Sequence, residues 1–524
     1  MRFAGLHYCA ANLIGLDTAK GYNRMKRNIF FIIAVVLLYA LSSCSATGSV
    51  AYTPERKYSP KQLKEDVQVM EETFKRNHPS LYWYSSKEEI DASFQQAYEK
   101  LKDSLNEIQF RNVIAETIFP IRCGHTSVRF SKNYNQFIAG KRLPTFPFVA
   151  KVVDDSTLVV TANLNRRDSL IRTGTPVLSI NGLTARQVID SLLPLVSIDG
   201  SSKNFSYQNI SNSFTTYYNI RFGLQKNYTI NYVNTRGELK QTVLPLFDPI
   251  RDTSRRRPFS ITPQTLPPFQ PDISERQQRL QRTRSFSIDS SRKFATLRIS
   301  SFSPALQKHF LKKAFKQLKK KKIQHLVIDV RNNGGGLIKK SLYLTRFISN
   351  EPFLFTDSVY SVQRKLRSSA KINKRLIYNL GLFFLNRKQQ NGIYRFKYFT
   401  DRVYEPLPQS YKGQMYLLTG GYSFSATTLF ASAVKGQKNV TIIGEETGGG
   451  YYGNNGVFIP EMILPNTKLR VRLPLYRIVN NKNYPKDGHG VLPDVEVKAS
   501  AESIRQNRDP KMEKAVELIM QRRG

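Results

Sequence analysis

The stretch that decides the fold is His325-Leu-Val-Ile-Asp329-Val330, an almost wholly apolar run that leads directly into Arg331-Asn-Asn333-Gly334-Gly335-Gly336. A continuous apolar run of this kind predicts a strand that is buried on both faces of its sheet. A helical pattern follows from Leu337 to Ile348. Glycines let the backbone approach another group closely, and amides at a helix start favour negative charge. Because the phosphate-loop pattern Gly-x-x-x-x-Gly-Lys is absent, the turn fits an oxyanion hole as well as an anion site.

Similar apolar runs occur on both sides of this stretch. Phe294 to Ile299 precedes it, Gln414 to Thr419 and Val440 to Gly444 follow it, and a helical pattern spans Leu306 to Leu318. Buried strands that alternate with helices are typical of an α/β sheet with helices on both faces. A basic aromatic segment at 350–411 interrupts this pattern, and we expect it to be an inserted surface lobe.

A second glycine-rich junction follows a later buried strand, with the sequence Thr419-Gly-Gly-Tyr-Ser423-Phe-Ser425-Ala426. A serine that opens a helix at the end of a buried strand is well placed for nucleophilic attack. The pattern differs from the Gly-x-Ser-x-Gly elbow of α/β-hydrolases. Considered alone, the junction also fits a serine, Ser423 or Ser425, that only caps the helix.

Helical patterns fill the N-terminal part of the chain. Ser59-Pro60-Lys61-Gln62 combines a capping serine, a first-turn proline and a glutamine at the third helical position, and apolar residues follow at helical spacing. A pattern capped by Ser86 and another from Ile108 to Ile118 complete a helical domain at 58–130. The domain ends near Cys123-Gly124-His125-Thr126, where a turn delivers a histidine.

From about Phe146 the apolar period changes to two, which predicts strands. Residues 145–249 resemble a PDZ domain, mainly through Gly174 to Gly182, a strand closed by a turn. Prolines and arginines then mark a linker at 250–290. The α/β core is expected at 291–500, and a C-terminal helix at 501–524.

Composition narrows the functional classes. The 524 residues include 80 Lys and Arg against 39 Asp and Glu, a formal net charge of +41. No zinc finger, RNA-recognition signature or basic zipper accompanies this charge, so we expect no nucleic-acid partner. Proximity to anionic lipid explains the charge better, and a merely solvated basic face explains it better still. With three cysteines, no Cys-x-x-Cys pair and six scattered histidines, we expect no disulfide framework, no metal site and no cofactor.

The N-terminus carries a targeting pattern. Lys26 and Arg27 precede an apolar run of 13 residues, Ile29 to Leu41, which is shorter than the roughly 20 residues of a membrane-spanning helix. Leu41-Ser-Ser-Cys44 resembles the bacterial lipobox, which implies that Cys44 is lipidated. An ordinary cleaved signal peptide is the alternative.

These features predict the order of the first segments. Residues 1–24 are expected to be an upstream start-site extension, residues 25–44 a lipoprotein signal peptide and residues 45–57 a tether. A lipid on Cys44 implies a membrane partner and a location in the cell envelope, as a periplasmic or surface-facing lipoprotein.

Three motifs together resemble those of the carboxyl-terminal processing (tail-specific) serine peptidases and their tricorn-like relatives. They are Asp329-Val-Arg-Asn-Asn-Gly-Gly-Gly, Tyr422-Ser-Phe-Ser-Ala-Thr-Thr-Leu-Phe-Ala and Gly444-Glu-Glu-Thr-Gly-Gly-Gly450, in the family's order and spacing. The succession of helical, PDZ-like and α/β segments also follows the family, so the resemblance covers most of residues 58–520. It implies a multidomain α/β protein with a ClpP/crotonase-like core and a nucleophile at Ser425.

Two positions depart from the processing proteases. Thr428 replaces the glutamate of the family's Ser-x-Ser-x-x-Glu pattern, and Gly450 stands where those enzymes carry a lysine base. The tricorn-like branch instead uses a histidine ahead of its PDZ-like domain. By resemblance, His125 would be this base.

The same branch uses a late glutamate to orient its histidine. Asp487, in Asp487-Gly-His-Gly-Val-Leu-Pro-Asp494, takes that place with a side chain one methylene shorter. Glu445 and Glu446 remain alternatives for this role. The resemblance places the oxyanion donors on backbone amides of Gly334 or Gly335 and of Ala426.

We therefore expect an exported, lipid-anchored serine endopeptidase that cleaves envelope proteins or peptides by a Ser/His mechanism. The departures at Thr428, Gly450 and Asp487 support an alternative, a catalytically inactive peptide-binding envelope scaffold with the same fold.

Overall fold

The computed structural model describes residues 52–252, 274–289 and 294–522. By its contacts the chain divides into two units, Met1–Thr53 and Pro54–Gly524. Every element described below belongs to the second unit, which has its own hydrophobic cores. The expected signal peptide, with Cys44, lies outside the described residues. Within the described ranges, no helix has the length and apolar character required to cross a membrane.

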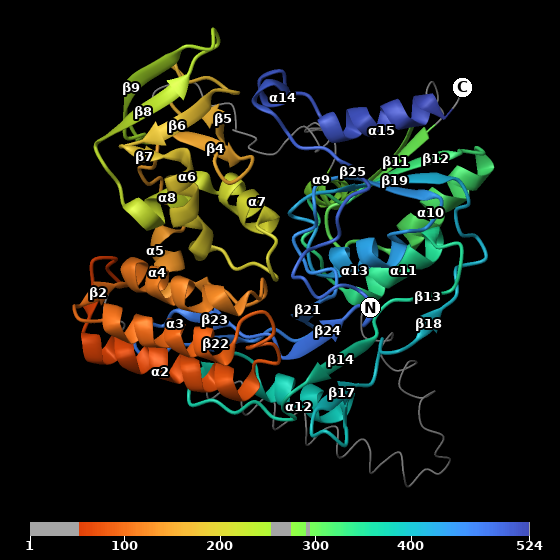
Figure 1. Ribbon diagram of the computed structural model, residues 1–524, viewed down its shortest axis with the longest axis horizontal. Coiled ribbons are helices and arrows are strands. Elements are labelled where there is room, and N and C mark those ends of the chain that lie inside the picture. Colours follow the sequence, from red (N-terminus) through yellow and green to blue (C-terminus); the bar gives the residue numbers. More distant parts are fainter. Residues whose placement is uncertain (1–51, 253–273, 290–293, 523–524) are drawn as a thin grey trace, which may run out of the picture. The chain divides into compact units, whose positions relative to one another are not determined.

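A six-stranded sheet organises the C-terminal half of the chain (Figure 1). Its order is β10–β11–β12–β19–β20–β25, and neighbours run parallel except that β10 is antiparallel to β11. The strands are β10 (Arg284–Asp289), β11 (Phe294–Ile299), β12 (His325–Asp329), β19 (Gln414–Thr419), β20 (Val440–Gly444) and β25 (Val495–Glu496). Parallel strands need crossover connections, which here contain α10 (Lys308–Lys320), α11 (Ile338–Ile348) and α13 (Ala426–Val434).

Both faces of this sheet are buried. In β12, Leu326 and Ile328 belong to a core cluster that includes side chains of α10, α11 and α13. Val327 lies between them in sequence but belongs to another cluster, with the C-terminal helix α15 (Pro510–Gln521). Since successive strand residues point to opposite faces, each face has its own covering helices. The predicted α/β core is confirmed.

Three helices lie in the N-terminal region, and the first two begin where their capping sequences predict. They are α2 (Pro60–Asn77), α3 (Lys87–Lys100) and α4 (Glu107–Ile118), and a short strand pair, β1 (Lys57–Tyr58) with β2 (Leu105–Asn106), joins their ends. Ser59, Ser86 and Asn106 each accept a hydrogen bond from the amide three residues on and receive the reciprocal side chain of a capping box. The short helix η1 (Phe119–Ile121) then ends this region.

A second sheet, of order β4–β5–β6–β8–β9 with β7 paired to β6, occupies the region where a period of two was noted. Its strands are β4 (Phe148–Val152), β5 (Leu158–Asn163), β6 (Pro176–Ile180), β7 (Leu183–Thr184), β8 (Asn227–Val233) and β9 (Leu239–Pro245). Helices α6 (Ala185–Leu192), η2 (Leu193–Leu195), α7 (Asn204–Asn212) and α8 (Phe214–Phe222) lie between β7 and β8 in the chain. A short helix, α5 (Lys132–Ile138), precedes β4.

The structure differs from the sequence prediction at the linker and at the insertion. Part of the expected linker is ordered as α9 (Glu275–Thr283) and as the edge strand β10. The insertion at 350–411 contributes strands to sheets shared with other segments, β16–β17–β14–β24–β21 and β15–β22–β23–β3, so it is more than a surface lobe. Its elements are β13 (Phe353–Leu354), β14 (Ser358–Ser361), β15 (Lys371–Ile372), α12 (Arg375–Leu385), β16 (Asn386–Lys388), β17 (Tyr394–Phe396) and β18 (Val403–Tyr404).

The partner strands of the insertion come from both ends of the chain. They are β3 (Val128–Arg129), β21 (Gly453–Gly456), β22 (Glu461–Ile463), β23 (Arg470–Arg472) and β24 (Tyr476–Val479). After the central sheet, α14 (Ala501–Arg505) precedes α15. Because β3 pairs with β23, the segment that follows the N-terminal helices is fixed to the C-terminal half.

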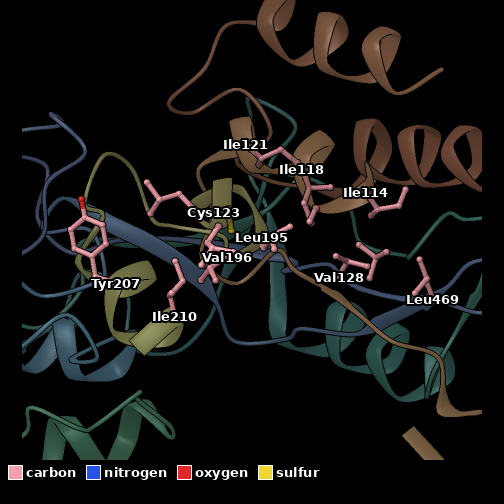
Figure 2. Close-up of a cluster of buried hydrophobic side chains, with 14 of the residues drawn as sticks. Ile114, Ile118, Ile121, Cys123, Val128, Leu195, Val196, Tyr207, Ile210 and Leu469 are labelled. Atoms are coloured by element: carbon pink, nitrogen blue, oxygen red, sulfur yellow. The ribbon is translucent and has the colours of Figure 1, made fainter. Parts of the chain in front are cut away.

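One hydrophobic cluster joins the N-terminal helices, the second sheet and the strands around residues 462–478. Figure 2 shows part of this cluster. Ile114, Ile118 and Ile121 come from the N-terminal helices, Cys123 and Val128 from the segment that follows them, Leu195, Val196, Tyr207 and Ile210 from the segment between β7 and β8, and Leu469 from the loop before β23. Burial raises the pKa of the Cys123 thiol to about 12, so this cysteine is a packing residue. Its burial anchors the backbone two residues before His125.

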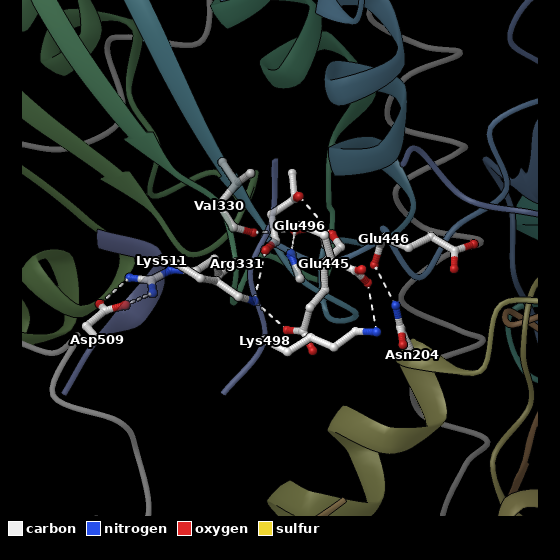
Figure 3. Close-up of polar contacts among 12 residues, drawn as sticks. Asn204, Val330, Arg331, Glu445, Glu446, Glu496, Lys498, Asp509 and Lys511 are labelled. Atoms are coloured by element: carbon white, nitrogen blue, oxygen red, sulfur yellow. Dashed lines mark hydrogen bonds and ion pairs between the residues drawn. The ribbon is translucent and has the colours of Figure 1, made fainter. Parts of the chain in front are cut away.

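Buried ion pairs fix the carboxyl ends of the central strands (Figure 3). Lys511, on α15, pairs with Glu445 directly after β20 and donates a hydrogen bond to the carbonyl of Thr419 at 3.1 Å. Burial alone would raise the pKa of Glu445, but the Lys511 ammonium holds it below its usual value. Arg331 likewise bridges Asp329, at the end of β12, and Asp509, the capping residue of α15.

Replacing Lys511 by methionine leaves the Glu445 carboxylate buried without its main cation. We expect Lys511→Met to lower the free energy of unfolding by about 3–5 kcal/mol, measured by urea denaturation. Lys514 lies on the same helix in an exposed pair with Glu517, so Lys514→Met should change stability by less than about 1 kcal/mol. Equal effects of the two substitutions would contradict this assignment.

Candidate active site

Ser425 lies between the turn that follows β19 and the first residue of α13. Its backbone has a positive φ, 58°, with ψ −122°, a sparsely populated conformation that costs a side-chain-bearing residue about 1–3 kcal/mol. The Ser425 hydroxyl makes no capping hydrogen bond to α13. Capping therefore does not account for Ser425, whose hydroxyl faces another partner.

Ser423 has the structural role. Its hydroxyl donates to the carbonyl of Val330 at 2.9 Å and accepts from the amide of Gly420 at 3.2 Å. Val330 follows β12 and Gly420 follows β19, so Ser423 joins the two glycine-rich turns. A Cβ atom on Gly335 would lie only 2.8 Å from the Ser425 Cβ, which explains why a glycine is needed where the first turn passes the serine.

His125 brings its imidazole to Ser425 from the other half of the chain. Its Nε2 lies 3.1 Å from Ser425 Oγ, and its ring lies against Phe424 with a centroid separation of 4.7 Å. Burial, aided by the positive charge of Arg472, lowers the pKa of His125 to about 3. The imidazole is therefore neutral near pH 7 and able to accept the Ser425 proton. The structure thus brings together the predicted nucleophile and the predicted base.

When His125 accepts a proton through Nε2, its Nδ1 carries the ring's other proton. In the described structure, Nδ1 is buried and has no hydrogen-bond partner. Three acidic residues were predicted to orient this ring, and each is engaged elsewhere. Asp487 accepts from the amide of His489 at 2.9 Å, Glu445 pairs with Lys511, and Glu446 accepts from the amide of Gly490 at 2.7 Å. The predicted contact of Asp487 with His125 is therefore not seen.

Sequence reasoning missed Asp199, a fully enclosed carboxyl group beside the histidine turn. Its Oδ1 accepts a hydrogen bond from the amide of Gly124 at 2.6 Å, and its Oδ2 has no hydrogen-bond partner among the described residues. Burial raises the pKa of Asp199 to about 7. The available signal was the dipeptide Asp199-Gly200, which indicates a turn but no particular partner.

Residues 199–204 cross from the histidine turn to the loops of the acidic motifs. The amide of Gly200 donates to Arg122 O, the amide of Ser201 donates to Gly488 O, and the Asn204 side chain donates to Glu446 O. Gly200 has φ 62°, and a Cβ atom there would lie 2.2 Å from Gly488 O. This crossing therefore requires glycine and fixes His125 relative to the C-terminal half.

His78 supports the same turn. The amide of Ser80 donates to His78 Nδ1 at 3.1 Å, so Nε2 carries the proton and donates to Thr126 Oγ1 at 2.8 Å. Burial lowers the pKa of His78 to about 3, which keeps this tautomer neutral. Thr126, next to His125, is thus held from α2's C-terminal end.

The backbone around Ser425 offers donors for an oxyanion. Ala426 is the first residue of α13, and the first amides of a helix have no partner inside it. The amide of Gly335 already donates to Asn333 Oδ1 at 2.9 Å. Of the two predicted glycine donors, this arrangement favours Gly334.

The positions that depart from the processing proteases are sterically closed. A Cβ atom on Gly450 would lie 2.4 Å from Gly453 O, so a lysine does not fit there without moving the backbone. Thr428 donates to Ser423 O at 3.2 Å, and its Oγ1 would lie 2.4 Å from a Cβ on Gly449. No group of three or more His, Cys, Asp or Glu side chains suited to a metal ion occurs within the described ranges.

A serine at the end of a buried strand, with a neutral histidine within hydrogen-bond distance, is the arrangement of a serine peptidase. Residues 293–497, which contain most of the central sheet and its helices, match the model of peptidase family S41. The resemblance to the tail-specific and tricorn-like peptidases is thereby confirmed.

Solved structures show the same fold. Mature CPAF is 17% identical, with a TM-score of 0.59 over 88% of this chain and 96% of CPAF. Mature CPAF complexed with lactacystin is 16% identical, with a TM-score of 0.58 over 88% of this chain and 98% of that one. No curated protein matches the chain in sequence.

Asp199 makes stability depend on pH. Its folded-state pKa of about 7 exceeds the roughly 3.9 of an unfolded aspartate, so its stabilising contribution is complete below about pH 4 and is lost as the pH rises to 7. Asp199→Asn keeps an oxygen for the Gly124 amide but cannot ionise. Relative to wild type, we expect the variant to gain a few kcal/mol of unfolding free energy between about pH 4 and 8. The unfolding free energies of wild type and variant are measured by urea denaturation at each pH. A difference between them that stays the same at all pH values would contradict this assignment.

Proposed function

We propose that this protein is an exported, lipid-anchored serine endopeptidase that cleaves envelope proteins or peptides. The observation that carries the proposal is the 3.1 Å separation of Ser425 Oγ and His125 Nε2. The match of residues 293–497 to the model of peptidase family S41 supports peptide-bond hydrolysis as the reaction. Export and anchoring are proposed from the signal pattern that ends at Cys44.

In the proposed reaction, Ser425 Oγ attacks the scissile carbonyl carbon while its proton passes to His125 Nε2. The carbonyl oxygen becomes an oxyanion and accepts hydrogen bonds from the amides of Ala426 and Gly334. As the tetrahedral intermediate collapses, the C–N bond breaks and His125 gives its proton to the departing amine. Water then attacks the acyl-enzyme by the same route, which releases the acid product and restores Ser425.

The missing carboxylate has a kinetic consequence. Protonated His125 would place a positive charge in a buried site where Nδ1 has no acceptor among the described residues. In a Ser–His–Asp triad, disabling the carboxylate lowers turnover by about 10,000-fold. For Asp487 to supply this group, the loop at 487–490 must move, because the Asp487 carboxylate accepts from the amide of His489 and makes no hydrogen bond to His125 Nδ1. We therefore expect turnover to be slow in the conformation described here.

The substrate is proposed to be a peptide or protein whose terminal segment docks on the PDZ-like region at 145–249. A sheet edge can accept an extended peptide as an additional strand, and β4 and β9 are the edges of this region's sheet.

The second candidate is a peptide-binding scaffold without catalysis. The unpartnered Nδ1 of His125 favours it, because a ring without an orienting acid is a weak base catalyst. A scaffold would bind peptides equally well in wild type and in Ser425→Ala and would cleave none of them.

An activated serine reacts with a fluorophosphonate probe. We expect wild type to be labelled and Ser425→Ala to be unlabelled, since the reacting oxygen is gone. His125→Ala should lower the labelling rate by at least about 100-fold, since it removes the general base. The rates can be read from in-gel fluorescence over time.

His489→Ala is the matched control for the histidine variant. Its side chain is half exposed and faces Glu446, at 3.2 Å, rather than Ser425, so labelling should be unchanged. Equal labelling of wild type and Ser425→Ala would refute the mechanism. A folded wild type that is never labelled, even with a peptide ligand present, would favour the scaffold.

The low pKa of His125 predicts how labelling responds to pH. Because the base is neutral above about pH 3, the labelling rate should change less than about twofold between pH 8 and 5. An unperturbed histidine, with a pKa near 6.5, would lose about 30-fold at pH 5. The measurement is best made in Asp199→Asn, where the other buried group that titrates in this range is absent.

A further inference from the structure

Helix α12 (Arg375–Leu385) presents an apolar face to solvent. Five large hydrophobic side chains on this helix are between 48% and 71% exposed: Leu376, Ile377, Leu380, Phe383 and Phe384. Their spacing of one, four, seven and eight residues from Leu376 places them in one stripe along the helix. We call these five residues the α12 stripe. Contiguous exposed apolar surface of this kind marks an interaction site.

The opposite face of α12 is packed, so the stripe does not result from a loosely attached helix. The ring of Tyr378 contacts Phe458 with a centroid separation of 5.5 Å, and a Cβ atom on Gly381 would lie 2.4 Å from the same phenylalanine ring. Leu382 is 1% exposed. The Arg375 guanidinium donates to the carbonyls of Ser368 and Leu366 at the helix start.

Positive charge predominates in the segment that carries the α12 stripe. Residues 361–398 contain ten Lys and Arg and no Asp or Glu. Eight of the ten are exposed: Arg364, Lys365, Arg367, Lys371, Lys374, Arg387, Lys388 and Lys397. Within the described parts of the chain, none of these eight forms an ion pair, so their charge is not neutralised by the protein itself.

Two of these cations lie at the border of the stripe. The Arg364 guanidinium lies 3.9 Å from the ring centroid of Phe383 and donates to the Phe383 carbonyl. Lys397 donates to the carbonyl of Phe384 at 2.6 Å. Long basic side chains beside exposed aromatic and aliphatic groups suit a boundary between hydrocarbon and polar headgroups.

We propose that the α12 stripe and its surrounding cations bind the surface of an anionic lipid bilayer. The stripe would enter the headgroup region, and the cations would contact lipid phosphates. A short amphipathic helix with leucine and phenylalanine on one face and flanking basic residues has the chemistry of a helix that lies in the membrane interface. The lack of acidic residues in 361–398, the segment that carries the helix, favours this partner over a polar or neutral protein surface.

This surface is independent of the predicted lipid on Cys44, and the experiment excludes that lipid. Residues 54–524 form a compact unit with its own cores, so this unit can be purified and sedimented with vesicles. Vesicles of phosphatidylcholine with phosphatidylglycerol should bind it, while phosphatidylcholine alone should not. Added salt should weaken binding because it screens the attraction between cations and headgroups.

The decisive variant is Leu376→Gln/Leu380→Gln/Phe384→Gln, which removes apolar contact at exposed positions only. We expect vesicle affinity to fall at least about tenfold, because burying each such side chain contributes substantially to interfacial binding. Leu239→Gln/Val243→Gln, at exposed positions of β9, is the matched apolar control and should bind like wild type. Fluorophosphonate labelling of the triple variant should equal that of wild type, since the stripe is not part of the site.

A third variant, Lys312→Glu/Lys313→Glu/Lys316→Glu, tests whether positive charge alone causes vesicle binding. These lysines lie on α10, which has no exposed apolar stripe. If this variant loses as much binding as the α12 triple variant, attraction is nonspecific and the proposal is wrong. Absence of wild-type binding, or unchanged binding by the α12 variant, would also overturn it. So would a dimer in sedimentation equilibrium that the α12 variant abolishes, because the stripe would then join two copies of the chain.

Discussion

The buried charges at the carboxyl ends of β12, β19 and β20 are the constraint on which the proposed site depends. Lys511 joins Glu445 to the carbonyl that ends β19, and Arg331 joins the end of β12 to the start of α15. The charged groups of each pair lose their hydration on burial and gain an interaction with each other. The pair therefore stabilises the fold only while both partners are present. The glycine-rich turns that carry Gly334 and Ser425 begin within a few residues of these charges. The C-terminal helix thus determines the position of backbone groups that it does not contact.

Within the described residues, the turn that carries His125 is not fixed by buried ion pairs. It is fixed by neutral or weakly charged contacts: the packed Cys123, the His78 bond to Thr126, and the Asp199 bond to the Gly124 amide. None of these touches the imidazole ring, so they set the position of the ring without raising its basicity. Burial lowers the pKa of the same ring. His125 is therefore close enough to Ser425 to accept its proton, but its buried surroundings disfavour the protonated imidazole that results. An acidic group that moved next to the ring would stabilise that charge, and its movement would then control the reaction.

Local patterns predicted much of this architecture. The apolar run at His325–Val330, the capping box at Ser59 and the juxtaposition of His125 with Ser425 followed from spacing or family motifs. Asp199 was missed because its role comes from a hydrogen bond to a residue 75 positions away, which no local pattern records. Strand β10 was assigned to the linker because its residues alternate between polar and apolar. A half-buried strand at the edge of a sheet has this pattern and lacks the continuous apolar run of a central strand. The orienting role of Asp487 was assigned by motif position, but motif position does not determine which amide a carboxylate accepts from.

The span of chain between the proposed base and nucleophile has a consequence for biosynthesis. His125 and Ser425 lie 300 residues apart, and the charges that hold the two glycine-rich turns include Asp509 and Lys511, both of which follow Ser425 in the chain. Synthesis must therefore extend beyond Lys511 before a competent site can assemble. Any proteolytic activity would then be delayed until that segment has been made, so a growing chain that lacks it is inactive.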